Sequence, residues 1–235
     1  MLLKFENVRK SYIGADGKSL DILENFNLDI ENGDFITVTG PSGSGKTTLL
    51  SIAGCLLRPD QGKVEFRGVN TAGLKDRKIS RLRNRWIGFV FQASHLMPSL
   101  TIMENVLVPQ IFAKDDNFIT EVEAKKRAIQ LLEELGILEQ AKQLPYQLSL
   151  GQRRRVSLAR ALINDPALVL ADEPTGDLDP DRGRQVAELL LQYWKQGTTV
   201  LMVTHEPWLA ELAPKQYRLD GKRLVSASNG ETPTY

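Results

Sequence analysis

Residues 36–53 read ITVTGPSGSGKTTLLSIA, and this stretch decides the fold. It begins with β-branched residues that favour a strand, passes through a glycine-rich loop, and ends in an apolar run that favours a helix. The octapeptide at residues 40–47 fits the pattern G-x-x-x-x-G-K-[ST], which binds phosphate groups where it joins a strand to a helix. With ordinary residue usage, chance would produce such an octapeptide in a chain of this length about once in a hundred. The sequence therefore favours a nucleotide site over an ordinary glycine-rich turn.

The residue types in this loop suit phosphate binding for physical reasons. Glycines allow backbone conformations that side chains would block, so successive N–H groups can point into one concavity. The start of the following helix adds the positive end of its dipole. We expect Lys46 to reach the β- and γ-phosphates and the Thr47 hydroxyl to ligate Mg²⁺. The residues predicted to contact nucleotide here are Gly40, Pro41, Ser42, Gly43, Ser44, Gly45, Lys46, Thr47 and Thr48.

Two adjacent acids, Asp172 and Glu173, follow the apolar run at residues 168–171. Side chains of neighbouring strand residues point to opposite faces, so the two acids can have separate roles. We expect Asp172 to hold Mg²⁺, directly or through water, and Glu173 to polarise the attacking water as a general base. Alone, the pair would more simply mark a strand that leaves the core for solvent. Beside a phosphate loop the catalytic interpretation is favoured, because this chemistry needs an acid from a second strand.

Expected strands alternate with expected helices along the chain, which indicates an α/β fold with a mainly parallel sheet. The predicted strands are residues 2–12, 21–30, 35–39, 63–67, 167–171 and 198–203, followed by a small strand pair near the end of the chain. The predicted helices are residues 46–57, 124–135, 151–163 and 181–195.

The fold class predicted is a P-loop NTPase core with an N-terminal antiparallel β subdomain and an inserted helical subdomain. We expect one domain over residues 1–235. Its nucleotide-binding core is expected at about residues 1–93 and 165–225, its helical subdomain at about 94–164, and a loose tail at 226–235.

The amino-acid composition limits the classes of protein to which this chain can belong. Apolar residues make up 42% and charged residues 25% of the chain, and the net charge is +1. This balance is that of a soluble globular protein without a basic field for nucleic acid, and the basic run at residues 75–85 reads as a solvated helix face. The lone cysteine, Cys55, excludes an internal disulfide and is expected to be a small buried residue. No apolar run is long enough to cross a bilayer, so we expect a cytoplasmic protein that would serve a membrane only as a peripheral partner.

Further motifs resemble those of ABC ATPases and occur in the order found in that family. The segment LSLGQ at residues 148–152 resembles the LSGGQ signature, and Gln92, after FVF, resembles the Q-loop glutamine. The segment GDLD at residues 176–179 resembles the D-loop, and His205, after Thr204, resembles the switch histidine. Tyr12 lies where the family places an aromatic residue under the adenine, although alone it would read as an edge-strand aromatic.

This resemblance implies two copies bound head to tail, with each ATP held between the phosphate loop of one protomer and the signature of the other. Ser149 and the N–H of Gly151 would then cap the γ-phosphate of the partner's nucleotide. Gln92 would contact Mg²⁺ and the lytic water, His205 would hydrogen-bond the γ-phosphate, and Asp179 would help to join the two sites. Mg·ATP would close the dimer, and hydrolysis would open it.

The segments at residues 95–101, 104–106 and 168–176 look like the branch of ABC ATPases that drives lipoprotein release and macrolide export. The implied partners are integral membrane permease subunits on the cytoplasmic face of the inner membrane. One alternative is an ATPase that regulates a membrane complex without transport, as in cell division. A soluble ABC ATPase acting on nucleic acid is a further alternative, but the tandem halves, coiled coils or zinc motifs of that class are lacking. A small-molecule kinase would leave the signature and the switch histidine unexplained.

Two features of the signature region call for separate expectations. Leu150 replaces the first glycine of the LSGGQ pattern, whereas Ser149, Gly151 and Gln152 are retained. A leucine side chain near the partner's triphosphate would crowd the interface, so we expect an active enzyme with weaker dimer closure. The three arginines at residues 153–155 are expected to form a solvated helix face.

Overall fold

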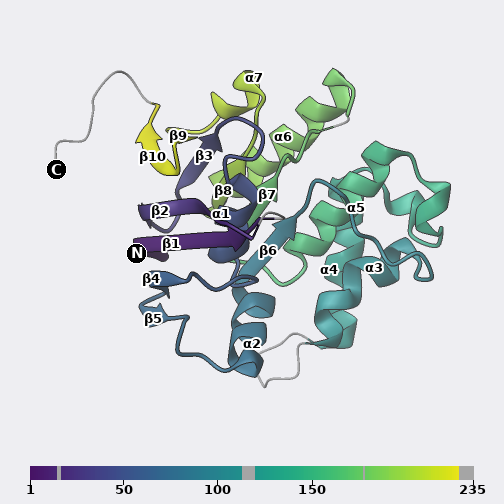
Figure 1. Cartoon of the computed structure of the whole chain (residues 1–235). Coiled ribbons are helices and arrows are strands. Elements are labelled where there is room, and N and C mark those ends of the chain that lie inside the picture. The colour runs from purple at the N-terminus through teal and green to yellow at the C-terminus, as the bar shows by residue number, and fades with distance from the viewer. Residues whose placement is uncertain (15–16, 113–119, 177, 228–235) are drawn as a thin grey trace.

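The computed structural model describes residues 1–14, 17–112, 120–176 and 178–227. Within these residues two sheets lie beside a group of helices, with α3, α4 and α5 together on the side away from β1, β2 and β4 (Figure 1). The helices are α1 (Lys46–Ala53), α2 (Asp76–Trp86), α3 (Ile102–Ile111), α4 (Glu121–Glu134), α5 (Leu150–Leu162), α6 (Pro180–Lys195) and α7 (Pro207–Ala210), with short 3₁₀ helices at Leu138–Gln140 and Pro145–Gln147.

The larger sheet has the strand order β10-β9-β3-β8-β7-β6. All its neighbouring strands pair in parallel except β9 and β10. The smaller sheet is antiparallel and has the order β2-β1-β4-β5. The strands are β1 (Leu3–Ile13), β2 (Ser19–Ile30), β3 (Phe35–Thr39), β4 (Gln61–Phe66), β5 (Val69–Asn70), β6 (Ile87–Val90), β7 (Leu168–Asp172), β8 (Thr199–Val203), β9 (Lys215–Asp220) and β10 (Arg223–Ser226). A mainly parallel sheet and an N-terminal antiparallel sheet confirm the predicted fold class.

Strand β7 shows how the larger sheet is buried on both faces. Leu168 and Leu170 belong to the core that packs against α1 and the antiparallel sheet, whereas Val169 and Ala171 belong to the core under α3, α4, α5 and α6. Alternate strand residues face opposite sides, so one unbroken apolar run supplies both cores. The same alternation puts Asp172 on the α1 side, together with Leu168 and Leu170.

Helix α1 was predicted to reach residue 57 but ends at Ala53. Gly54 follows at the C-cap, and a Cβ at that position would lie 1.8 Å from the Phe89 ring, so the chain passes too close to β6 for a side chain. Cys55 then takes a positive φ of 55°, which breaks the helical path. Cys55 is half-buried, and this burial raises the pKa of its thiol to about 11, which keeps the thiol protonated at neutral pH.

The structure differs from two further predictions about helices. Helix α4 begins at Glu121, earlier than the apolar spacing indicated, because Thr120 and Glu123 form a capping box at its start. The basic run on α2 is solvated only in part, since Arg83 is half-buried and donates to the Cys55 carbonyl at 3.0 Å. Of the expected tail, Ser226 ends β10, and residues 228–235 lie outside the described part.

Candidate functional site

The motif segments meet at one edge of the parallel sheet. Strands β3, β8, β7 and β6 are neighbours in that order, and they all run in the same direction. Their carboxyl ends therefore lie at the same edge, where open α/β sheets bind ligands. The segments that leave this edge are the phosphate loop after β3, Thr204 and His205 after β8, Asp172 and Glu173 at the end of β7, and Gln92 just after β6.

The phosphate loop has a shape that only glycine permits at two positions. Gly40 has φ +155°, and a Cβ there would lie 2.7 Å from the Leu219 carbonyl oxygen. Gly45 has φ +104°, and a Cβ there would lie 2.5 Å from the Ile22 side chain. The Lys46 ammonium group donates to the carbonyl oxygens of Gly40 and Pro41 at 2.8 and 2.9 Å. The Lys46 side chain therefore folds back across its own loop and places its ammonium group beside Gly40 and Pro41.

Thr47 and Asp172 lie face to face, as predicted for a metal site. The Thr47 hydroxyl donates to Oδ2 of Asp172 at 3.0 Å. Burial raises the pKa of Asp172, and the nearby charge of Glu173 adds to this rise. A hydroxyl and a carboxylate are the oxygen ligands that Mg²⁺ takes beside a nucleotide, and a cation here would offset the cost of burying the carboxylate. The residues present therefore fit Mg²⁺.

Glu173 and His205 form the second pair at this edge. Nδ1 of His205 lies 3.0 Å from Oε1 of Glu173, and the backbone N–H of His205 donates to Oε2 at 3.3 Å. The hydrogen bond to Glu173 raises the pKa of His205. Glu173 is 9% exposed and has a positive φ of 44°, an uncommon conformation for a residue with a side chain. The chain thus turns sharply after Asp172 and presents the two acids in different directions.

The remaining predicted site residues lie on separate elements. Gln92 is exposed and close to Gly176, where a Cβ would lie 3.9 Å from its amide nitrogen. Tyr12 is 44% exposed near the end of β1, opposite Leu20 of β2. Asp179 is the N-cap of α6 and accepts the Arg182 N–H at 3.1 Å. Asp177, the other D-loop acid, lies outside the described residues.

The signature forms the start of α5. Ser149 is its N-cap: the Ser149 hydroxyl accepts the N–H of Gln152, and the Gln152 side chain accepts the N–H of Ser149. A Cβ on Gly151 would lie 2.9 Å from Cδ of Arg182 of α6, so the start of α5 packs against that side chain. Leu150 is 38% exposed at the first position of the helix. The signature is therefore held by its own capping contacts and by packing against α6, and Ser149 and Leu150 at the start of α5 are exposed.

The arginines after the signature were predicted wrongly as a solvated face. Arg154 is 1% exposed and donates to the carbonyl oxygens of Phe91 and, at 3.1 Å, Gly176. Arg155 is half-buried and donates to the Leu135 carbonyl at 2.9 Å. Arg154 lies on the buried side of α5, and the spacing 151, 154, 158, 161 would have indicated this. It joins the segment that carries Gln92 to the segment that follows Glu173.

Comparisons with known proteins agree with this geometry. The family described as ABC transporter matches residues 23–176. The lipoprotein-releasing system ATP-binding protein LolD of Aquifex aeolicus is 42% identical over 222 residues, which cover 94% of this chain and 95% of LolD. The pyoverdine export ATP-binding/permease protein PvdT of Pseudomonas fluorescens is 42% identical over 99% of this chain but only 35% of PvdT. The chain thus spans about a third of that relative's length.

A solved structure shows the same fold. The dimeric post-hydrolysis state of the ATP-binding cassette MJ0796, bound to ADP and Pi, superimposes with a TM-score of 0.88. It is 37% identical in sequence, and the match covers 100% of both chains. In the described part of this chain, no helix has the length and apolar character that crossing a membrane requires.

Proposed function

Because this chain belongs to the ABC transporter family, we propose that it binds Mg·ATP at the carboxyl edge of its parallel sheet and drives separate membrane subunits. One observation carries the proposal: four neighbouring parallel strands deliver the phosphate loop, His205, the acids Asp172 and Glu173, and Gln92 to one edge. Such an edge can bind a triphosphate and place a base beside it. We propose residues 94–164 as the helical subdomain and the rest of the described chain as the nucleotide-binding core.

Each residue has a role that follows from its chemistry. Backbone N–H groups of the phosphate loop and the Lys46 ammonium bind the phosphate oxygens. Thr47 and Asp172 would hold Mg²⁺, which would neutralise phosphate charge when bound. Glu173 accepts a proton from the attacking water, and His205 holds Glu173 on one side while facing the γ-phosphate on the other.

The second half of each site comes from another copy. The start of α5 is an exposed helix N-terminus, and such termini bind anions through their free N–H groups. MJ0796, which has the same fold, is dimeric in its ADP-bound structure. We therefore propose that Ser149 and Gly151 of one copy cap the γ-phosphate bound by the other, and that Asp179 lies at their interface.

Leu150 is the residue we expect to weaken this dimer. Replacing it with glycine removes an exposed apolar side chain from the surface that meets the partner's triphosphate. We expect Leu150→Gly to lower the ATP concentration needed for half-maximal dimerisation about fivefold, which corresponds to about 1 kcal/mol. Size-exclusion chromatography with light scattering measures this in a background where hydrolysis is blocked. Leu150→Ala serves as the control for the helix-weakening effect of glycine, and an unchanged midpoint in both variants would show that Leu150 is neutral.

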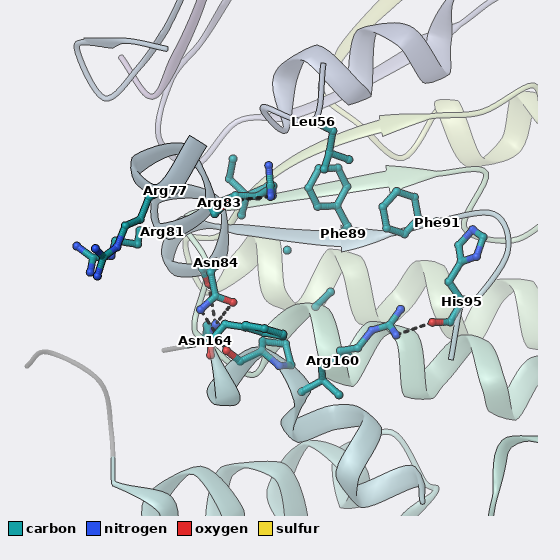
Figure 2. A pocket seen from close by; sticks show the side chains of 17 residues that line it. Leu56, Arg77, Arg81, Arg83, Asn84, Phe89, Phe91, His95, Arg160 and Asn164 are labelled. Atoms are coloured by element: carbon teal, nitrogen blue, oxygen red, sulfur yellow. Dashed lines mark hydrogen bonds between the residues drawn. The ribbon is translucent and has the colours of Figure 1, made fainter. Parts of the chain in front are cut away.

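A groove on the helical side offers a docking surface for a membrane subunit. It has a volume of about 860 Å³ and lies between α2, β6, α3 and α5. Figure 2 shows the Phe89 and Phe91 rings along its middle, Arg77 and Arg81 at one end, and His95 and Arg160 at the other. The two phenylalanine rings are stacked, with centroids 5.0 Å apart. Phe91 directly precedes Gln92, so the groove adjoins the segment that carries Gln92.

The charge of the groove indicates what it binds. Among the described residues that line it, arginine occurs four times and neither aspartate nor glutamate occurs. Apolar side chains supply its middle, and Phe112 at its rim is 67% exposed. A segment with an apolar face and flanking acidic residues would complement both features. We propose that the cytoplasmic segment of a membrane permease subunit has this character.

The groove proposal predicts that charge reversal breaks the complex. We expect Arg77→Glu with Arg81→Glu to abolish co-purification of the membrane subunit from detergent-solubilised membranes, while the ATPase activity of the free chain is unchanged. Lys195→Glu with Arg223→Glu makes the same change in charge outside the groove and should retain the subunit. If both double variants still co-purify with the membrane subunit, the groove is not its docking site. If nothing embedded in the membrane co-purifies with the native chain, the transporter proposal itself fails.

The kind of system is proposed from the relatives. Their names describe lipoprotein release and pyoverdine export, so we propose that the membrane subunits belong to an export or lipoprotein-release system. We therefore propose that the chain lies at the cytoplasmic face of the membrane. The membrane protein that co-purifies would identify the system.

A further inference from the structure

A second set of contacts joins the two catalytic loops behind the Glu173–His205 pair. Thr175 lies two residues after Glu173 in the loop after β7, and Glu206 directly follows His205 in the loop after β8. Oε1 of Glu206 accepts the Thr175 hydroxyl at 3.1 Å, and Oε2 accepts the indole N–H of Trp208 at 2.5 Å. We call Thr175, Glu206 and Trp208 the Glu206 cluster. The Glu206 cluster is a second link between these two loops, in addition to the contact between Glu173 and His205.

The Glu206 cluster fixes both the side chain and the backbone next to His205. Thr175 is 2% exposed, so its hydroxyl depends on a protein partner, and Glu206 supplies one. The backbone N–H of Glu206 donates to the Thr204 hydroxyl at 3.0 Å, and Thr204 is fully buried. His205 therefore lies between two anchored residues. These contacts hold the backbone from which the His205 imidazole, whose side chain is 67% exposed, reaches Glu173.

Trp208 extends the same contacts to α6. A Cβ on Gly183 would lie 3.8 Å from the Trp208 ring and 3.6 Å from Cβ of Thr175, so all three pack together. Gly183 is in the first turns of α6, and Asp179 is the N-cap of that helix. A hollow of about 340 Å³ separates Trp208 from Asp179 and Pro180. The Glu206 cluster thus also contacts the helix that presents Asp179.

We propose that Glu206 is a positioning residue for ATP hydrolysis, and that Thr175 and Trp208 act through it. By tying the loop after β7 to the loop after β8, it sets where His205 lies relative to Glu173. The inference rests on the proposed ATPase function of this site. Catalysis depends steeply on such placement, because a displacement of about 1 Å can cost about 100-fold in rate.

Two variants each remove one hydrogen bond and keep the shape. Thr175→Val removes only the hydroxyl donor, and Trp208→Phe removes the indole N–H while keeping an aromatic ring. We expect each to lower kcat about tenfold and to leave KM for ATP within about twofold, because the phosphate loop is untouched. In the double variant we expect a loss close to that of the more damaging single variant, since both changes release the same carboxylate.

Matched controls separate positioning from stability. Trp194→Phe also removes an indole N–H bond, the one to the Gly33 carbonyl at 2.7 Å. Thr71→Val also removes a buried hydroxyl bond, the one to the Val64 carbonyl at 3.0 Å. Thr71 follows β5, and Trp194 lies near the end of α6 far from Gly183, so we expect these controls to lower Tm as much as the cluster variants do while keeping the native kcat.

The possible outcomes decide the proposal. Native kcat in Thr175→Val and Trp208→Phe overturns it, as does an equal loss of kcat in the matched controls. Losses that multiply in the double variant also overturn it, because the two side chains would then act independently. If the native chain itself does not hydrolyse ATP, the proposed function fails, which the unaltered protein shows before any variant is made.

Discussion

We expect replacement of Glu173 with glutamine to stop ATP hydrolysis and to leave ATP binding intact. Glutamine has nearly the same size, so the turn at the end of β7 and the contact with His205 can persist. It carries no charge, however, and cannot accept the proton of the attacking water. Loss of a general base costs about 10²- to 10⁴-fold in rate, and we expect the upper part of that range because Glu173 is only 9% exposed. Two copies should then stay joined by the nucleotide that neither can cleave.

Phosphate release and light scattering at saturating Mg·ATP measure both effects. Glu188→Gln is a suitable control, because it removes an exposed carboxylate from α6 and should keep native turnover. Full activity in Glu173→Gln would remove Glu173 from the role of base. A variant that is inactive but stays monomeric would instead contradict the proposed nucleotide-bridged dimer.

We expect replacement of Lys46 with methionine to weaken ATP binding and to remove ATP hydrolysis. The side chain keeps its length and apolar stem but loses the ammonium group, which is the cation of the phosphate loop. Lys46 is 9% exposed, so water cannot readily replace that charge. Removing one charged donor from such a site costs about 10²- to 10³-fold in turnover, and affinity for ATP should fall as well.

Calorimetric titration with ATP tests the binding, and light scattering tests the dimer. Lys125→Met makes the same chemical change on the exposed side of α4 and should behave as the native chain does. Should Lys46→Met still form dimers at the ATP concentrations that the native protein needs, the phosphate loop would not be the site that holds the nucleotide.

The sequence allowed prediction of the fold and of the site's main residues because both depend on local patterns. The apolar run before Asp172 predicts a strand buried on both faces, and the loop at residues 40–47 predicts a phosphate site between strand and helix. Neighbouring parallel strands have their carboxyl ends at the same edge of a sheet. Correct prediction of a parallel sheet therefore also predicts that the phosphate loop and the two acids lie close together. This explains why Thr47 and Asp172 are in contact although 125 residues separate them.

What the sequence did not reveal depends on contacts between distant side chains. Arg154 looked like one of three solvated arginines, yet it is buried because carbonyl oxygens of two other segments satisfy it. The Glu206 cluster likewise exists only because two loops lie side by side. Helix α1 ends with Gly54 at its C-cap, a local stop signal that the expected run to residue 57 passed over, and β6 lies close to that glycine.

The direction of the parallel strands also has a practical consequence. The phosphate loop, Gln92, Asp172, Glu173 and His205 all lie at the carboxyl edge, so the turns at the opposite edge are remote from them by the length of a strand. Gly197, in the turn before β8, has open space around it, and β8 is five residues long, or about 17 Å. A fluorescent or affinity tag inserted at this turn would report on assembly without disturbing the nucleotide.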